Sequence, residues 1–205
     1  MTLRGNDPRT QLLGREYYQT PFGENYLLFG PIAIHSFAGI TKRLLSPNKS
    51  PARPRPLSSL LTMTGYATFL FFLPIHYTTH RLLPTSPDAP ISSLGPAELD
   101  FEFVKLGLQK WPWTNWFLYV GLVGSVALHM ADGLNIINNT WFRNGTGGRA
   151  GVFAGRKRMR ALVLGGLVLP VLTGLYAISR EPPIVFSSIA RRFEAVFLES
   201  GMYFA

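Results

Sequence analysis

Four apolar segments, each close to the length that a helix needs to cross a lipid bilayer, constrain the fold of this chain more than any other feature. A membrane-spanning helix takes about 20 predominantly apolar residues, because the hydrocarbon offers no water to hydrogen-bond the backbone. The segments are 26–45, 58–83, 114–137 and 161–179. They predict an all-α, polytopic membrane protein with four transmembrane helices.

The composition agrees with a membrane protein and limits its chemistry. Hydrophobic residues make up 47% of the 205 residues and charged residues 15%, whereas charged residues make up about 25% of a typical soluble domain. The sequence has no cysteine, which excludes disulfides, thiolate metal sites and a cysteine nucleophile. The formal charge of +9 is gathered beside apolar segments. We therefore interpret it as a topology signal and expect no nucleic-acid partner.

The four segments differ in how closely their sequences match those of typical membrane-spanning helices. The first has only a short apolar run before Lys42 and Arg43, whose aliphatic stems would have to reach the membrane interface. Pro74 lies inside the second segment and Pro170 inside the fourth. Each proline removes a backbone hydrogen bond, so both helices should bend. The third segment opens with WPWTNWFLYV, whose aromatic residues are typical of a membrane interface.

The charges of the connecting segments indicate how the chain is threaded. Basic residues without any acid occupy 42–58 and 143–160, whereas 84–112 holds four acids and two lysines. Because basic residues gather on one side of a membrane, four crossings would place both basic connections on one side. The acidic connection would then lie with both termini on the other side. The proline-rich run SPNKSPARPRP, 46–56, is typical of an extended linker and, secondarily, of a short peptide ligand.

The chain divides into three parts by composition. These are a polar N-terminal segment, 1–25, a transmembrane domain, 26–179, and a C-terminal segment, 180–205. In the last part Ile189, Phe193 and Phe197 repeat at helical spacing, with charged residues on the opposite face. This pattern predicts an amphipathic helix in the membrane interface rather than a fifth crossing.

An internal repeat surrounds two of the histidines. GPIAIHSFAGI and GSVALHMADGL place a glycine, an alanine, a histidine and a second glycine at the same offsets, so that His35 aligns with His129. Gly39 aligns in the same way with Gly133. The second and fourth segments share the related sequences FLPIHYT and VLPVLTG. The repeats together predict two related helix pairs.

The paired histidines raise the question of a cofactor. A histidine inside a membrane span either hydrogen-bonds to a neighbouring helix or belongs to a functional site. If the first and third crossings run in the same direction, His35 and His129 can both ligate the iron of a haem b. Gly39 and Gly133, one turn further on, would leave room for the flat macrocycle or for another helix. His76 is the other candidate partner of His35. By residue count along the spans, His129 lies deeper in the membrane than His35, so a packing role without haem is slightly favoured.

Two other polar residues of the spans have simpler interpretations. His80 lies near the end of its segment, where an interfacial location is expected. Asp132 is the only acid within the four segments. It could orient His129, three residues earlier, or pair with Lys42 or Arg43 on the basic side. A solvated carboxylate near the helix end is an equal alternative.

The stretches REYYQTPFGENYLLFGPIAIHSFAGITKRLL, LTMTGYATFLFFLPIHYTTHRLLP and YVGLVGSVALHMADGL resemble the fungal mitochondrial MDM-ten-complementing membrane proteins. The likeness covers residues 15–135. It implies a multi-span mitochondrial protein, in the outer membrane in yeast, that supports lipid homeostasis and serves as a receptor for a bridge-like lipid-transfer protein at organelle contacts. An earlier helix of the longer members has no counterpart in this sequence.

A second, shorter resemblance keeps a haem function in consideration. HMADGLNIINN is similar to the haem-ligand helix of the succinate dehydrogenase cytochrome b subunit. That family continues with an arginine and a second histidine where this chain has Asn135 and Ile136. We therefore expect a non-enzymatic mitochondrial scaffold whose partners are membrane lipids and a lipid-transfer protein. The alternative is a haem b membrane anchor or electron-transfer subunit of a respiratory complex.

Overall fold

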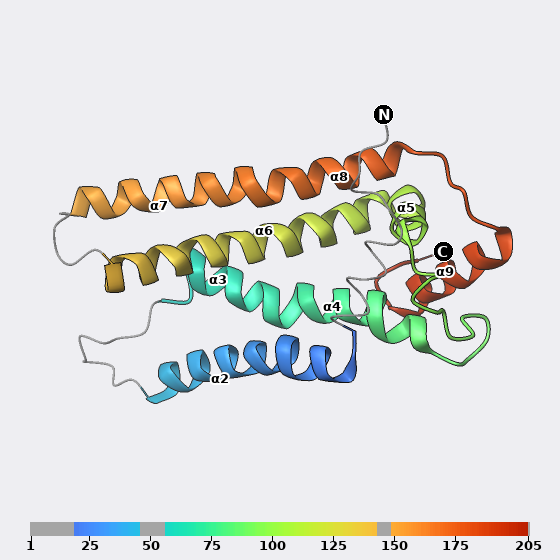
Figure 1. Ribbon diagram of the computed structural model, residues 1–205, viewed down its shortest axis with the longest axis horizontal. Coiled ribbons are helices and arrows are strands. Elements are labelled where there is room, and N and C mark those ends of the chain that lie inside the picture. Colours follow the sequence, from blue (N-terminus) through green and yellow to red (C-terminus); the bar gives the residue numbers. More distant parts are fainter. Residues whose placement is uncertain (1–18, 46–55, 143–148, 205) are drawn as a thin grey trace. The chain divides into compact units, whose positions relative to one another are not determined.

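The computed structural model describes residues 19–45, 56–142 and 149–204 (Figure 1). These residues fall into two compact units, one comprising 1–56 and 94–100 and the other 57–93 and 101–205. Every element in the described ranges is helical. The prediction of an all-α fold is thus confirmed for this part of the chain.

The part of the first unit that the structure describes, 19–45, 56 and 94–100, contains one helical rod. A π-helical stretch, η1 (Gly23–Phe29), continues directly into α2 (Gly30–Leu45). Thr20 precedes the helix and accepts hydrogen bonds from the backbone of Gly23 and Glu24, at 3.0 Å to its hydroxyl and 2.8 Å to its carbonyl oxygen. His35 lies on the exposed surface of α2.

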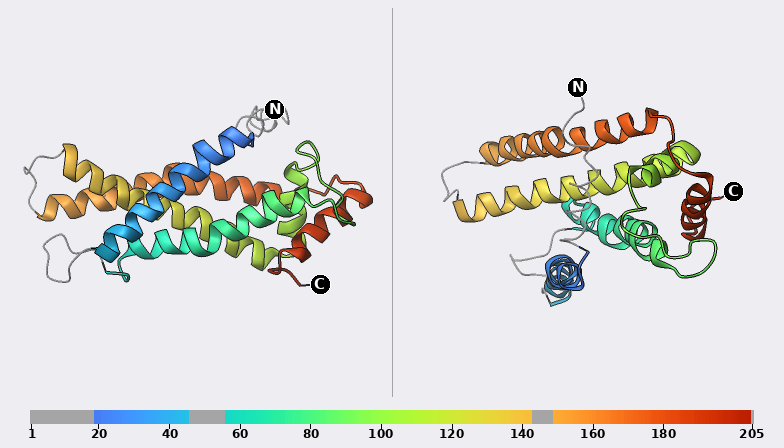
Figure 2. Two further views of the ribbon diagram at one scale, coloured as in Figure 1. Left: turned by 90° about the horizontal axis from the view of Figure 1, so that it is seen from below. Right: turned by 45° about the vertical axis from the view of Figure 1, so that its right-hand side comes forward.

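The second unit contains the remaining helices. A continuous rod over residues 60–85 is built from α3 (Leu60–Ala67), η2 (Thr68–Phe72), α4 (Leu73–Tyr77), η3 (Thr78–Leu82) and η4 (Leu83–Thr85). The other elements are α5 (Phe101–Lys110), α6 (Pro112–Ile137), η5 (Asn138–Phe142), α7 (Arg149–Val163), η6 (Leu164–Val168), α8 (Leu169–Arg180) and α9 (Ser187–Glu199). In both Figure 1 and Figure 2 the α7–α8 rod runs alongside α6, and α9 lies beside α5.

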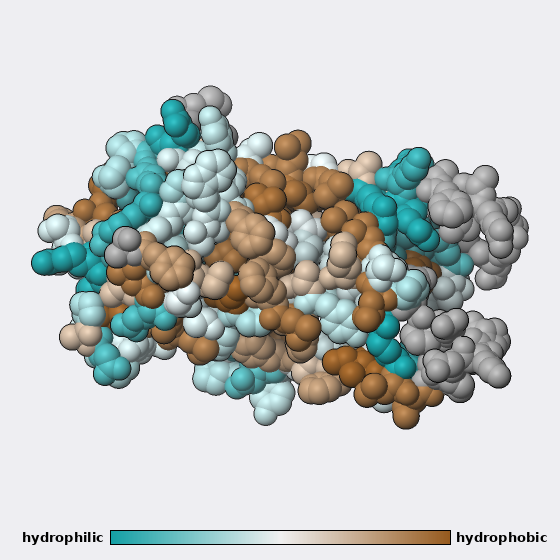
Figure 3. Space-filling view, turned by 180° about the vertical axis from the view of Figure 1, so that it is seen from behind, coloured by the Kyte–Doolittle hydropathy of each residue, from teal (hydrophilic) through white to brown (hydrophobic). Residues whose placement is uncertain are grey.

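Among the described residues, three helices are long and apolar enough to cross a membrane: Leu60–Thr85, Pro112–Trp141 and Gly155–Arg180. They correspond to the second, third and fourth predicted segments. Little of each span is buried within the protein, and Figure 3 shows much exposed apolar surface in brown. The first predicted segment, 26–45, is helical but is not among the three. A fourth crossing therefore stays a proposal.

The three spans alternate in direction. α3 begins at the end of the unit where α6 finishes and α7 begins (Figure 1). The basic residues at the start of the third span, Arg156, Lys157, Arg158 and Arg160, lie at this end. α5 and α9 lie at the opposite end. The second unit therefore separates a basic end from the end that carries the acidic connection.

In both proline-containing spans, a π-helical stretch precedes the proline by the same number of residues. η2 ends two residues before Pro74, and η6 ends two residues before Pro170. Proline removes a helical hydrogen bond and its ring crowds the carbonyl four residues earlier, so the preceding turn opens into a π-helical form. The equal offset agrees with the alignment of FLPIHYT with VLPVLTG.

The segment 84–112 differs from expectation. It was expected to be a loop but contains the helix α5. This helix packs against α9. Phe103 of α5 stacks on Phe197 with ring centroids 4.5 Å apart and meets Phe193 edge-on at 5.2 Å. We call α5, α9 and residues 200–204 the cap. Phe193 and Phe197, part of the face that was predicted to lie in the membrane interface, are buried against α5, and an interfacial location of α9 stays a prediction.

We call the contact between the rod 60–85 and α6 the seam. Along it, glycines of one helix lie against large side chains of the other. A methyl group placed on Gly65 would lie 2.7 Å from the ring of His129, and one on Gly121 would lie 2.2 Å from the ring of Phe72. Between these contacts the Thr68 hydroxyl of the same rod donates a hydrogen bond to Ser125 Oγ at 2.9 Å. Glycines let helices approach closely in membranes, where packing and hydrogen bonds replace the hydrophobic effect.

This seam predicts that Gly121→Leu destabilises the protein by about 1–3 kcal/mol, because the new side chain overlaps Phe72 in a filled interface. Gly133→Leu is the matched control, because no neighbouring side chain or backbone lies within 4 Å of its Cβ position. Unfolding in detergent micelles, followed by circular dichroism, measures both. Equal loss of stability in the two variants would show that the close contact of Gly121 with Phe72 does not contribute to stability.

Candidate functional site

His129 is held by a backbone contact across the seam. Its Nδ1 atom lies 2.9 Å from the carbonyl oxygen of Leu61 on α3. A carbonyl oxygen only accepts, so Nδ1 carries the proton and Nε2 of a neutral ring carries the lone pair. His129 thus points toward α3, and this hydrogen bond to a neighbouring helix is compatible with either the packing role or the haem ligation considered above, so its role stays a prediction.

The other members of the predicted haem site are divided between the two units. His35 and Gly39 belong to the first unit, so their pairing with His129 or His76 stays a prediction. Gly133 has no neighbouring side chain or backbone within 4 Å of its Cβ position. The close helix approach expected there occurs at Gly65 and Gly121 instead.

Asp132 forms an ion pair that sequence reasoning missed. Both oxygens of its carboxylate accept hydrogen bonds from the Arg160 guanidinium, Nε to Oδ1 at 2.8 Å and Nη2 to Oδ2 at 2.7 Å. The carboxylate is 8% exposed and the arginine 30%. Such a two-point contact is among the strongest hydrogen-bonded pairs in proteins. Asp132 therefore ties α6 to α7 through Arg160, a partner that was not among those expected from the sequence.

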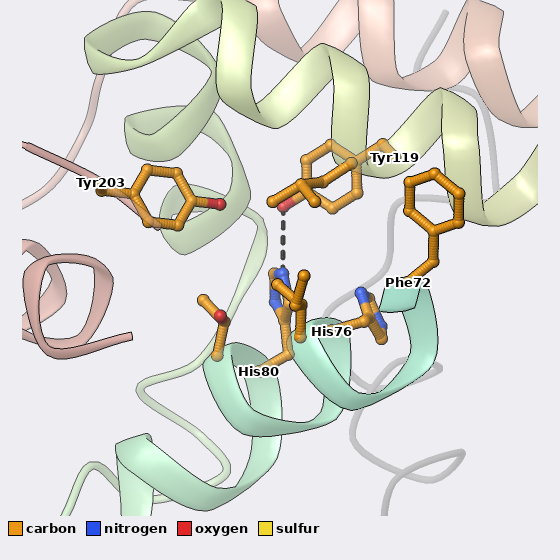
Figure 4. Close-up of a pocket in the computed structure, with 8 residues that line it drawn as sticks. Phe72, His76, His80, Tyr119 and Tyr203 are labelled. Atoms are coloured by element: carbon orange, nitrogen blue, oxygen red, sulfur yellow. Dashed lines mark hydrogen bonds between the residues drawn. The ribbon is translucent and has the colours of Figure 1, made fainter. Parts of the chain in front are cut away.

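A second polar cluster lies toward the other end of the same spans (Figure 4). His76 and His80, one turn apart, stack with ring centroids 4.4 Å apart, and His80 Nε2 lies 3.2 Å from the Tyr119 hydroxyl of α6. The cluster borders a cavity of about 10 Å³, together with Phe72, Ile75, Thr79, Leu118 and Tyr203. His80 is thus a packed interior residue rather than only an interfacial one.

The cavity contains an unsatisfied hydroxyl. Thr79 is 1% exposed, and its Oγ1 has no hydrogen-bond partner in the described structure. A volume of this size holds about one water molecule. It has no room for a haem macrocycle, and haem ligation by His76 together with His35 stays a prediction.

The cap is fastened to the third span by polar contacts. Lys105 of α5, 3% exposed, pairs with Glu102 and with Glu181 and donates to the Pro182 carbonyl at 3.2 Å. Burial lowers the pKa of Lys105, but the hydrogen bonds and charges of Glu102 and Glu181 outweigh it and hold that pKa above its ordinary value. Gln109 donates to the carbonyls of Ser179 and Glu181, at 3.2 and 2.7 Å, and so satisfies the end of α8.

Tyr203 joins the cap to the start of α6. Its hydroxyl donates a hydrogen bond of 3.1 Å to Asn115 Oδ1, and Asn115 Nδ2 donates to the Gly107 carbonyl at 2.8 Å. Burial raises the pKa of Tyr203. The phenol therefore stays protonated and keeps donating throughout the physiological pH range.

The fold and these sites define a polytopic helical membrane protein whose polar groups are concentrated where its spans meet. The sequence model of the family described as MDM10-complementing protein 1, transmembrane domain, matches residues 71–179, more than half of the chain. The chain belongs to this family. The match includes His76, Tyr119 and His129 but not His35. No curated protein and no solved structure matches the chain.

The ion pair predicts that Asp132→Asn destabilises the second unit by about 1–3 kcal/mol, because Arg160 loses its charged partner in a partly buried place. The double variant Asp132→Asn/Arg160→Gln should recover part of this loss, as expected for two residues that interact directly. Thermal unfolding in nanodiscs provides the comparison, with the exposed Lys157→Gln as control. An Asp132→Asn protein as stable as the parent would exclude the pair as a tie between α6 and α7.

Proposed function

We propose that the protein is a mitochondrial membrane protein, of the outer membrane, that supports lipid homeostasis as a scaffold or receptor for a lipid-transfer protein at organelle contacts. The observation that carries the proposal is membership of the MDM10-complementing protein 1 family, whose match begins within the first candidate span and covers the second and almost all of the third. In this role the protein binds membrane lipids and a protein partner and catalyses no reaction.

The structure of the second unit suits a receptor. Its cap is a folded body with its own aromatic core, and the contacts of Lys105 and Gln109 fix it to the exit of the third span. A partner that docks on the cap would meet a preformed surface, which limits the entropy lost on binding. The spans position this surface relative to the bilayer.

We also propose that the first unit supplies a fourth crossing, which would complete the two related helix pairs that the internal repeat predicts. The helix formed by η1 and α2 extends over 23 residues, from Gly23 to Leu45, counting 7 in η1 and 16 in α2. Lys42 and Arg43 lie in its last turn, where positive charge both complements the helix dipole and favours the basic side of the membrane.

Four crossings predict that epitope tags inserted near Lys49 and Gly147, two positions outside the described residues, are protected from protease together in intact mitochondria. A tag near Ala89, in the acidic connection, should behave oppositely. Protease digestion and immunoblotting, before and after membrane solubilisation, give the readout. Opposite accessibility of the Lys49 and Gly147 tags would contradict an even number of crossings between them.

The receptor role predicts that a contact-site partner co-purifies with the protein from mitochondria. If that partner docks on the proline-rich run and not on the cap, Pro54→Ala/Pro56→Ala should reduce its recovery. The proline-rich run 46–56 lies, except for Pro56, outside the described residues, and extended proline-rich segments lose little entropy on docking. Quantitative mass spectrometry of the captured proteins and lipids is the measurement, with membrane insertion of the variant as control. Unchanged partner recovery would remove this linker from the proposed interface.

A haem b subunit is the second candidate, and the geometry of His129 favours it. Metal-bound histidines usually donate their other ring nitrogen to a carbonyl or carboxylate, as His129 Nδ1 does to Leu61. The same purified protein decides between the two roles. A Soret band that is lost in His35→Ala and His129→Ala but kept in His80→Ala would replace the scaffold proposal, whereas colourless protein that retains its partner supports it.

A further inference from the structure

The cavity beside His76 and His80 has the composition of a small metal site. The two histidines are four residues apart on one helical rod, a spacing that places both imidazoles on one face. Their rings stack at a centroid distance of 4.4 Å, and a turn of the His76 ring about its side-chain bonds would bring one nitrogen of each ring to a shared ion. Imidazole nitrogens suit zinc, copper, nickel and cobalt.

Tyr119 supplies a third donor atom from the facing helix. Its phenolic oxygen lies 3.2 Å from His80 Nε2. Two ligand atoms bound to one ion at about 2.1 Å lie about 3.0 Å apart in an octahedral and about 3.4 Å apart in a tetrahedral arrangement. The observed separation falls between these values. A hydrogen bond between the same two atoms can thus be exchanged for coordination without moving α4 away from α6.

Thr79 provides independent support for a polar occupant. Its hydroxyl is buried, borders the same cavity and has no partner. Native proteins rarely leave such a group unsatisfied, and an orphan of this kind indicates a water or an ion. The cavity of about 10 Å³ limits the occupant to one atom or one small molecule such as water.

We propose that His76, His80 and Tyr119 bind one divalent transition-metal ion, with zinc(II) as the reference ion, and that Thr79 hydrogen-bonds a water on that ion. The neutral imidazoles bind through their lone pairs, and the phenol releases its proton to solvent when its oxygen becomes a ligand. No group of three histidine, aspartate or glutamate side chains converges anywhere in the described ranges, so the proposed site reaches three protein donors only through the Tyr119 phenol. The site joins the first candidate span to the second and so would lock the seam at its cap-proximal end.

The test uses the full chain, purified in nanodiscs with an affinity tag that contains no histidine. Cobalt(II) chloride is the probe, because its visible absorption reports coordination, and zinc chloride should displace it. We expect one cobalt per chain. His76→Leu and His80→Ala should each weaken binding at least tenfold, and Tyr119→Phe should weaken it and change the spectrum.

The variants are chosen so that unfolding is not mistaken for loss of a ligand. Leucine at position 76 matches Leu172, its counterpart in the related sequence of the third candidate span, and circular dichroism checks that each variant is folded. His129→Ala is the control, since its ring contacts Leu61 rather than the cavity. Folded parent protein without saturable cobalt binding, which would mean that the cavity holds water only, overturns the proposal. So does equal binding by a folded His76→Leu/His80→Ala double variant.

Discussion

The close contact of α3 with α6 determines where the polar groups of the second unit meet. Hydrocarbon provides no hydrophobic force between helices, so shape and hydrogen bonding must hold them together. His129 over Gly65, Thr68 on Ser125 and Phe72 over Gly121 succeed one another at intervals of about one helical turn. The next two turns of the rod carry His76 and His80. Because the two helices keep the same alignment, these turns lie beside Tyr119 of α6. The histidine cluster is thus a consequence of glycine placement a few turns away.

Hydropathy and charge predicted most of the architecture because they depend on the bilayer and not on side-chain detail. The second, third and fourth segments agree with the three spans, and both prolines mark widened turns. α5 was missed because four acids around it suggested a solvated loop. Its buried face, Phe103, Gly107 and Leu108, does follow helical spacing, and that pattern could have identified it.

The site was harder to predict because it depends on which helix faces which. Asp132 and Arg160 are 28 residues apart, and nothing in the local sequence of either one identifies its partner. The repeat drew attention to Gly133, but one sequence cannot show which glycine faces a neighbour, and the contacts fall at Gly65 and Gly121. The four-residue spacing of His76 and His80 was visible. Tyr119, taken as an interfacial aromatic, becomes their neighbour only when α6 is packed against the rod.

The cap joins two parts of the chain that two membrane spans separate. Phe103 precedes α6, whereas Phe193 and Phe197 follow α8. α5 and α9 can therefore meet only after α6 and α7–α8 have both entered the bilayer and returned the chain to the side where it started. If either span failed to insert, α9 would remain across the membrane from α5, and both helices would expose aromatic surface. Correctly inserted molecules would therefore hide this surface, whereas misinserted ones would expose it.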